Sequence, residues 1–141
     1  MNQVQKLRSI HKHKPDGSMK ILIVDDNEDF LTLMEALLSG HDFQPLIARD
    51  GKQAREYLEG ERVDVIISDV FMPTLDGVRF HSYVREFLGY TDIPFIFMSG
   101  YDDPYTRDAI EDTSVDFFIS KMTPVTEVIS ALENLRSKVH A

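Results

Sequence analysis

Five apolar segments alternate with five amphipathic segments along the chain, and this alternation constrains the fold more than any other feature. The apolar segments are KILIVDD (20–26), QPLIA (44–48), VDVIIS (63–68), PFIFM (94–98) and VDFFIS (115–120). Short, nearly continuous apolar strands separated by helices are typical of a parallel sheet that helices cover on both faces. The 141 residues suit a single domain of this kind.

The amphipathic segments repeat apolar residues at helical spacing. The apolar groups that we expect to face the core are Phe30, Leu33, Met34, Leu37 and Leu38 in the first helix, Ala54, Tyr57 and Leu58 in the second, Phe80, Val84, Phe87 and Leu88 in the third, and Val125, Val128, Ile129, Leu132 and Leu135 in the last. Asp50, Asp76 and the pair Asp103-Pro104 are suited to start the second, third and fourth helices, and Thr123-Pro124 to start the last.

Right-handed crossovers leave few arrangements for five such units. The common doubly wound arrangement has the strand order 2-1-3-4-5, as in flavodoxin-like folds. In that order the first and third strands are neighbours, and ligands bind in the crevice between their carboxyl ends. We therefore expect an α/β fold with a five-stranded parallel sheet, and a site where the strands of segments 20–26 and 63–68 end.

Charged and hydroxyl side chains stand at the ends of four of these strands. The first strand ends in Asp25-Asp26, the third in Asp69, the fourth in Ser99 and the fifth in Lys121. Each residue alone has an ordinary structural explanation, because an aspartate after a strand often caps a helix, a serine often turns the chain and a lysine is often a solvated surface residue. These separate explanations do not predict that all five side chains should lie at one edge of one sheet.

Three carboxylates at one edge are costly without a counter-charge. Two carboxylates about 4 Å apart repel by roughly 4 kcal/mol at an effective dielectric constant near 20. A divalent cation relieves this repulsion, and carboxylates with a backbone carbonyl and waters match the oxygen shell that Mg²⁺ prefers. With Lys121 nearby, a metal-bound Asp69 would be set up as a nucleophile toward a phosphoryl group.

At these residues the chain resembles the receiver domain of response regulators in two-component signalling, the CheY-like class. The matching motifs are ILIVDDNEDF, VDVIISDVFMPTLDG, PFIFMSG and VDFFISK, in the family's order and spacing over most of residues 19–137. The resemblance implies that Asp69 accepts a phosphoryl group from a phosphohistidine. It also implies that Asp26, Asp69 and the backbone carbonyl of Phe71 bind Mg²⁺ or Mn²⁺, with Asp25 assisting.

The resemblance further implies a switch. Ser99 would hydrogen-bond the phosphoryl group, Lys121 would pair with it, and the aromatic switch position falls on Phe118. Movement of Ser99 and Phe118 would alter the face formed by the fourth helix, the fifth strand and the last helix. The implied partners are a sensor histidine kinase or histidine phosphotransfer protein, a downstream protein or an output domain of its own, and a second copy that dimerises through that face.

The chain departs from the family pattern in three respects. Met122 follows Lys121 where the family normally has a cis proline, so this bond is expected to be strained or trans. Phe118 lacks the hydroxyl that a tyrosine would offer. Phe71 and Tyr101, each two residues beyond a site residue, are both aromatic; we expect them to shield the acyl phosphate from water or to be ordinary surface aromatics.

Charge and composition restrict the partners. The net charge is −9, yet residues 1–20 carry +4, so the remaining chain carries −13 and would repel nucleic acid. We expect residues 1–18 to form a flexible basic arm and residues 19–139 the receiver domain. The chain has no cysteine, secretory signal or apolar run long enough to span a bilayer, so we expect a cytoplasmic protein without direct nucleic-acid or membrane binding.

Two other functions remain as alternatives. The same fold could dock partners without being phosphorylated, an alternative that the Lys121-Met122 departure favours and the acidic cluster opposes. A haloacid-dehalogenase-like phosphatase would need a second acid two residues after the nucleophile, but Phe71 stands there after Asp69 and Asn27 after Asp25. We therefore expect a phosphoacceptor that catalyses only its own phosphorylation and dephosphorylation, rather than an enzyme.

Overall fold

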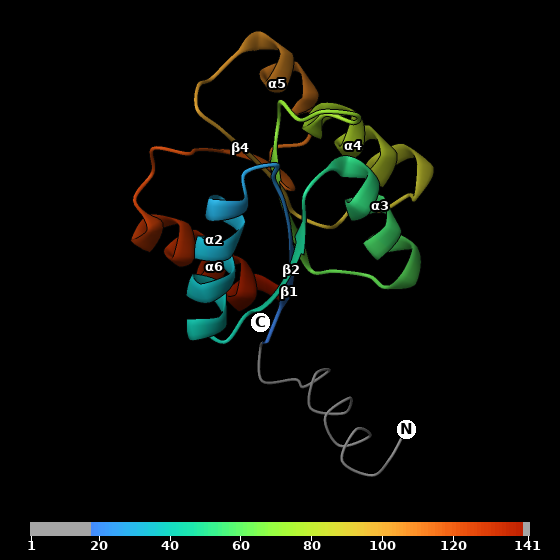
Figure 1. Cartoon of the computed structure of the whole chain (residues 1–141). Helices are drawn as coiled ribbons and strands as arrows, with labels where there is room; N and C mark the ends of the chain where they lie inside the picture. Colours follow the sequence, from blue (N-terminus) through green and yellow to red (C-terminus); the bar gives the residue numbers. More distant parts are fainter. Residues whose placement is uncertain (1–17, 140–141) are drawn as a thin grey trace.

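The computed structural model describes residues 18–139, which form one parallel sheet with helices on both faces (Figure 1). The strand order is β2-β1-β3-β4-β5, which confirms the expected doubly wound topology. The strands are β1 (Lys20–Val24), β2 (Gln44–Ala48), β3 (Val65–Asp69), β4 (Phe95–Ser99) and β5 (Asp116–Ser120). The basic arm that we expected in residues 1–18 falls, except for Ser18, outside the described residues.

The helices cover the sheet in two layers. They are α2 (Glu28–Gly40), α3 (Gly51–Gly60), α4 (Gly77–Ser82) with the π-helical turn η1 (Tyr83–Phe87), α5 (Pro104–Ala109) and α6 (Val125–Val139). Figure 1 shows α2 and α6 on one side of the sheet and α3 and α4 on the other. Each layer has its own apolar cluster, one holding Leu31, Met34 and Leu132, and the other Leu58, Phe80 and Phe97 among its members. No helix of the described residues combines the length and apolar character needed to cross a membrane.

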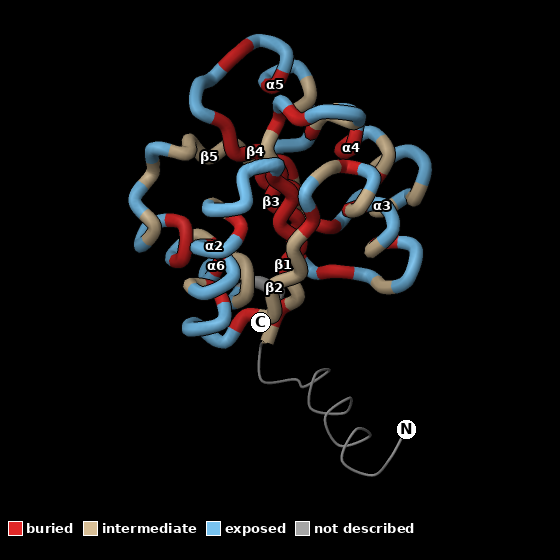
Figure 2. Tube along the Cα trace, in the orientation of Figure 1, coloured by how far each residue is buried: buried red, intermediate tan, exposed pale blue. Residues whose placement is uncertain are grey.

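Burial explains why the three central strands are almost entirely apolar. Every residue of β4, and all but one residue of β1 and of β3, is buried, whereas β2 and β5 are largely half-buried (Figure 2). β2 and β5 lie at the edges of the sheet. Pro45 is tolerated in β2 because an edge strand has one side without ladder hydrogen bonds.

Three helix caps are those expected from the sequence, and the cap of α2 differs. The carboxylates of Asp50, Asp76 and Asp103 accept the capping backbone N–H of α3, α4 and α5, as expected. In α2 the cap is instead Asn27, whose side chain accepts the Phe30 N–H. Asp25 and Asp26 therefore do not serve as the helix cap.

Two expected core residues are exposed. In α2 the buried stripe is Leu31, Met34 and Leu38, and Leu33 lies about 100° around the helix from Met34, on the solvent side. Phe87 is 76% exposed and lies within the π-helical turn η1, which the Leu88 N–H closes by donating to the Tyr83 carbonyl and which is wider than an α turn. Phe87 stacks on Tyr83 instead of entering the core.

A buried ionic cluster fastens α4 and η1 to β5. One carboxylate oxygen of Asp116 lies 2.6 Å from a guanidinium nitrogen of Arg85 and 2.9 Å from Nε2 of His81. Arg85 also donates to the backbone carbonyls of Tyr90 and Val115. The Asp116 and His81 side chains are almost entirely buried, so neither water nor salt screens the cluster effectively.

We predict that Asp116→Asn lowers the free energy of unfolding by about 3 kcal/mol, because removing one partner leaves the Arg85 charge buried and unpaired. Urea denaturation measures the change. The control is Asp92→Asn, which breaks an exposed pair in which one guanidinium nitrogen of Arg62 contacts both Asp92 oxygens and should cost less than about 1 kcal/mol. Equal losses in the two variants would contradict the prediction.

Candidate functional site

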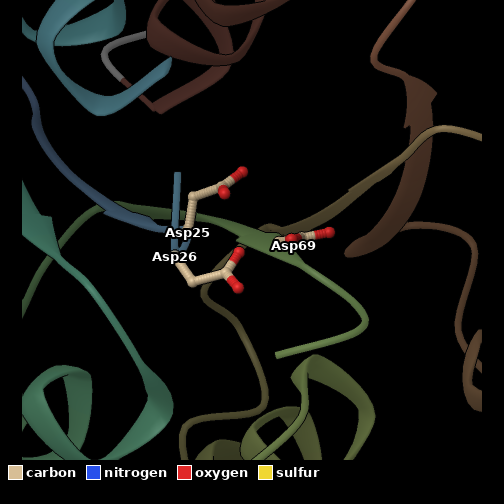
Figure 3. Close-up of side chains that lie close together, drawn as sticks. All are labelled: Asp25, Asp26 and Asp69. Carbon is tan, nitrogen blue, oxygen red and sulfur yellow. The ribbon is translucent and has the colours of Figure 1, made fainter. Parts of the chain in front are cut away.

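The three candidate acids meet where β1 and β3 end. The register pairs Val24 of β1 with Ser68 of β3, so the next residues, Asp25 and Asp69, lie side by side at the carboxyl edge. Figure 3 shows the carboxyl groups of Asp25, Asp26 and Asp69 directed toward one common region. One oxygen from each lies within 4.8 Å of the others. The expected convergence of these residues is therefore present.

Asp25 is the buried member of the cluster, with 1% of its surface exposed. Its Oδ1 accepts a hydrogen bond from the Asn27 N–H at 2.9 Å. Its Oδ2 lies 2.6 Å from Nζ of Lys121 and accepts no hydrogen bond of good geometry from the described residues. This oxygen therefore depends on the lysine charge, or on a cation, for compensation.

Asp69 is more accessible than Asp25, with 12% of its side chain exposed. Its Oδ1 accepts the Val70 N–H at 2.8 Å, and its Oδ2 lies 3.5 Å from Nζ of Lys121. Burial and the nearby Asp25 charge raise the pKa of Asp69 above its ordinary value, although Lys121 and the Val70 hydrogen bond oppose the shift. Ionised Asp69 is thus less favourable in the folded protein than in the unfolded chain, and the Lys121 charge offsets only part of this free-energy cost.

Lys121 reaches the cluster from the end of β5. Its backbone N–H donates to the carbonyl of Ser99 at 2.9 Å, and its ammonium also lies 4.9 Å from the centre of the Phe30 ring. Burial alone would lower the pKa of Lys121, but the nearby carboxylates of Asp25 and Asp69 outweigh it and raise the pKa. The bond to Met122 is trans, so this departure from the family pattern does not keep the ammonium from the acids.

Ser99 and Phe118 occupy the remaining predicted positions. Ser99 is buried at the end of β4, and its neighbour in the register is Ser120 of β5. Phe118 is partly buried and packs against the apolar cluster on the α3 and α4 side of the sheet. In this structure Phe118 is therefore turned toward core residues rather than fully out to solvent.

A glycine that we did not single out fixes the backbone beside Asp69. A Cβ on Gly77 would lie 2.1 Å from the Asp69 carbonyl oxygen, and the Gly77 N–H donates to the Val70 carbonyl at 2.7 Å. Only glycine allows α4 to start this close to the end of β3. The sequence signal was a glycine directly after the cap Asp76, where a better helix former would otherwise be expected.

Phe71 and Tyr101 come together as one aromatic stack with a third ring that the sequence analysis missed. The rings of Phe71 and Tyr101 lie 5.8 Å apart with an interplanar angle of 15°, and Phe71 and Tyr105 lie 6.4 Å apart at 29°. The Tyr105 hydroxyl donates to the carboxylate of Asp76 at 2.9 Å. Phe71, Tyr101 and Tyr105, hereafter the aromatic stack, thus connect the segments that follow β3 and β4.

The acidic cluster has the donor chemistry of a site for a hard divalent cation. Carboxylate oxygens from Asp25, Asp26 and Asp69 lie close enough to share one ion, and oxygen ligands are those that Mg²⁺ prefers. The buried Oδ2 of Asp25, which has the lysine charge as its compensation, fits the same interpretation. The residues present therefore fit a metal site of the kind expected from the sequence.

Comparison with known proteins agrees with this geometry. The family model described as "Response regulator receiver domain" matches residues 21–133. The chain is 27% identical over 124 residues to the alkaline phosphatase synthesis transcriptional regulatory protein PhoP of Bacillus subtilis, covering 86% of this chain and 51% of PhoP. It is 28% identical over 103 residues to the CAI-1 autoinducer sensor kinase/phosphatase CqsS of Vibrio cholerae, covering 72% of this chain and 15% of CqsS.

A solved structure shows the same fold over nearly its whole length. The chemotaxis protein CheY4 of Vibrio cholerae superposes with a TM-score of 0.76 at 24% identity, covering 84% of this chain and 98% of that one. The chain therefore spans about half of PhoP and a small part of CqsS, but almost all of CheY4.

The raised pKa of Asp69 predicts how its charge affects stability. Since the folded protein binds the Asp69 proton more tightly than the unfolded chain does, ionised Asp69 lowers the stability above its folded pKa. That cost disappears as the pH falls below the pKa of an unfolded aspartate, about 3.9. We expect Asp69→Asn to be more stable than the wild type at pH 7 and the difference to shrink toward pH 4.

Urea denaturation in EDTA at several pH values measures this difference. The matched control is Asp108→Asn, since Asp108 is exposed on α5 and should show no comparable pH-dependent gain. A wild-type protein more stable than Asp69→Asn at pH 7 would contradict the prediction.

Proposed function

Because the chain belongs to the response regulator receiver domain family, we propose that it is a phosphorylation-dependent switch that accepts a phosphoryl group on Asp69. The donor is a phosphohistidine of a sensor histidine kinase or of a histidine phosphotransfer protein. The observation that carries the proposal is the convergence of Lys121 and three carboxylates on one edge of the sheet.

The transfer uses the ionised carboxylate of Asp69 as the nucleophile. One of its oxygens attacks phosphorus while the phosphorus–nitrogen bond of the donor breaks, leaving the electron pair on the histidine nitrogen. The Lys121 ammonium, 3.5 Å from Asp69 Oδ2, is placed to balance charge on the phosphoryl oxygens. Ser99, buried at the end of the adjacent strand β4, supplies a hydroxyl that can hydrogen-bond a phosphoryl oxygen.

We propose Mg²⁺, or Mn²⁺, as the cofactor of this site. Asp26, Asp69 and the backbone carbonyl of Phe71 would hold it, with Asp25 assisting. When bound, the ion would supply positive charge next to the transferring phosphoryl group. The carboxylates alone would repel an incoming phosphate, and Lys121 neutralises only part of their charge.

The output of the switch is a change in partner affinity. Ser99 and Phe118 lie on adjacent strands, β4 and β5, so a shift of Ser99 toward a phosphoryl group can be coupled to a reorientation of Phe118. The surface affected is formed by α5, β5 and α6. Phosphorylation can shift the protein between two states only by its differential interaction with them, at about 1.4 kcal/mol per factor of ten.

The relatives are described as several kinds of protein, and these descriptions are compatible with several kinds of partner. One is described as a sensor kinase/phosphatase, one as a transcriptional regulatory protein and one as a chemotaxis protein. Receiver domains pair with histidine kinases, so such a kinase is the proposed upstream partner. Downstream, the surface of α5, β5 and α6 would bind a separate protein, an output domain, or a second copy of the chain.

Phosphorylation of Asp69 can be tested directly. After incubation with acetyl phosphate and Mg²⁺, we expect the intact mass of the wild type to rise by one phosphate, and that of Asp69→Asn to stay unchanged, because the amide is not a nucleophile. EDTA should reduce the labelling of the wild type by about tenfold or more. Asp108→Asn, an exposed acid changed in the same way, should be labelled as the wild type is.

Other outcomes would identify the alternatives. An unlabelled wild-type protein that still binds its partner would indicate a phosphorylation-independent interaction module. Repeated turnover of a generic aryl phosphate would indicate a phosphatase. Labelling of Asp69→Asn to the same extent would place the phosphoacceptor elsewhere.

We also propose that Phe71 and Tyr101 restrict the access of water to the phosphorylated site. Their rings stack on each other, and they follow β3 and β4 at the edge where Asp69 lies. We predict that Phe71→Asn increases the rate of aspartyl-phosphate decay by about three- to tenfold, which corresponds to a barrier lowered by roughly 1 kcal/mol.

Decay is followed by intact mass after the phosphodonor has been removed. The control is Phe87→Asn, which replaces a highly exposed aromatic residue on η1, outside the segments that flank Asp69, and should leave decay unchanged. Decay of Phe71→Asn at the wild-type rate or more slowly would refute the shielding.

A further inference from the structure

Helix α5 is attached to the rest of the domain by few contacts. Within α5 only Thr106 is buried. A cavity of about 520 Å³ lies beside the helix, lined by residues of α4 and η1 and by Tyr105 and Asp108. A short helix beside a cavity gains little from apolar packing. Its position therefore depends on the specific contacts that the described residues make.

Tyr105 makes the most specific of these contacts. Its hydroxyl lies 2.9 and 3.1 Å from the two carboxylate oxygens of Asp76, while its ring stacks on Phe71. A tyrosine hydroxyl has an ordinary pKa of about 10, so it is protonated at neutral pH and remains a donor. One side chain thus links α5 to the segment after β3 through both its ring and its hydroxyl.

The Asp76 end of this link is firmly fixed. Asp76 caps α4 by accepting the Arg79 N–H at 2.9 Å, and Gly77 packs against the Asp69 carbonyl, leaving no room for a Cβ. Thr74, with φ of 73°, is in a conformation that a β-branched residue keeps only when its surroundings impose it. The hydroxyl of Tyr105 therefore bonds a carboxylate that is itself anchored at the start of α4, close to Asp69 in the fold.

The aromatic stack needs such a link because it is poorly covered. Phe71 is 47%, Tyr101 61% and Tyr105 43% exposed, so apolar burial alone holds the rings together weakly. We propose that the Tyr105 hydroxyl, by donating to Asp76, holds the stack closed beside Asp69 and thereby slows hydrolysis of the aspartyl phosphate. This inference rests on the proposed function of Asp69, and Tyr105 is a positioning residue in it.

The step that is slowed is the attack of water. A water oxygen attacks phosphorus, the bond between phosphorus and the Asp69 oxygen breaks, and the products are the Asp69 carboxylate, inorganic phosphate and a proton released to solvent. The stack acts by limiting where water can approach. Loss of the hydroxyl should loosen Phe71 and Tyr101 without removing any ring.

Tyr105→Phe tests the proposal, because it removes the hydroxyl and keeps the ring. Proteins labelled with acetyl phosphate and Mg²⁺ are desalted, and decay is followed by intact mass. We expect decay about three- to tenfold faster than in the wild type, the size expected for one partly exposed hydrogen bond to a carboxylate. Tyr57→Phe, which removes a hydroxyl from α3, should decay as the wild type does, and Tyr105→Phe decay within twofold of the wild type overturns the proposal.

A double variant separates positioning from general destabilisation. If Tyr105 acts through Phe71, adding Tyr105→Phe to Phe71→Asn should increase decay by much less than it does in the wild type. Fully multiplicative effects would show that the hydroxyl acts independently of the stack, and would overturn the proposal.

Hydrogen exchange tests the link without phosphorylation. In unphosphorylated Tyr105→Phe, the amides of residues 100–106 should exchange several-fold faster than in the wild type, and unchanged exchange overturns the proposal. An unlabelled wild-type protein would refute the phosphoacceptor function, whereas a labelled wild type with unchanged decay and exchange in Tyr105→Phe would refute only the role of Tyr105.

Discussion

The concentration of negative charge at the carboxyl edge of the sheet is the constraint on which the site depends. Three carboxylates share this edge, and Lys121 lies 2.6 Å from Asp25 and 3.5 Å from Asp69. The lysine cannot neutralise all three, and the raised pKa of Asp69 reflects its burial and, after that, the Asp25 charge. A cation at this site would make the surplus charge tolerable, and the cluster supports the phosphoryl chemistry that we propose.

The backbone around the carboxyl edge is held by more contacts than α5, which forms part of the surface proposed to change on phosphorylation. Gly77 allows α4 to start directly against the Asp69 carbonyl, and Asp116 ties α4 and η1 to β5 through a buried ionic cluster. Helix α5, by contrast, buries one residue and is joined to this framework through Tyr105 and Asp76. Such a division suits a switch, because the reacting atoms need a fixed geometry while the responding surface must be able to move.

Much of the site could be predicted from the sequence because parallel strands place their carboxyl ends at one edge. Asp25, Asp26, Asp69, Ser99 and Lys121 each follow or end an apolar strand, and strand order then determines which of them meet. Tyr105 and Gly77 could not be predicted in the same way. Tyr105 acts through partners about 30 residues away, Phe71 and Asp76, and the role of Gly77 depends on how closely α4 approaches β3.

By itself the sequence determined the five strands, three of the helix caps and the residues that gather at the carboxyl edge, because these follow from local periodicity and from short-range hydrogen bonding. Only the tertiary structure decided which acid is buried, that Asn27 rather than an aspartate caps α2, that Phe87 in the π-helical turn η1 is exposed, and that Tyr105 bonds Asp76. The reason is physical: the burial of Asp25 and the Tyr105–Asp76 bond depend on distances between segments far apart in the chain, which packing sets. The Asn27 cap and the η1 turn are local alternatives between which the sequence pattern does not discriminate.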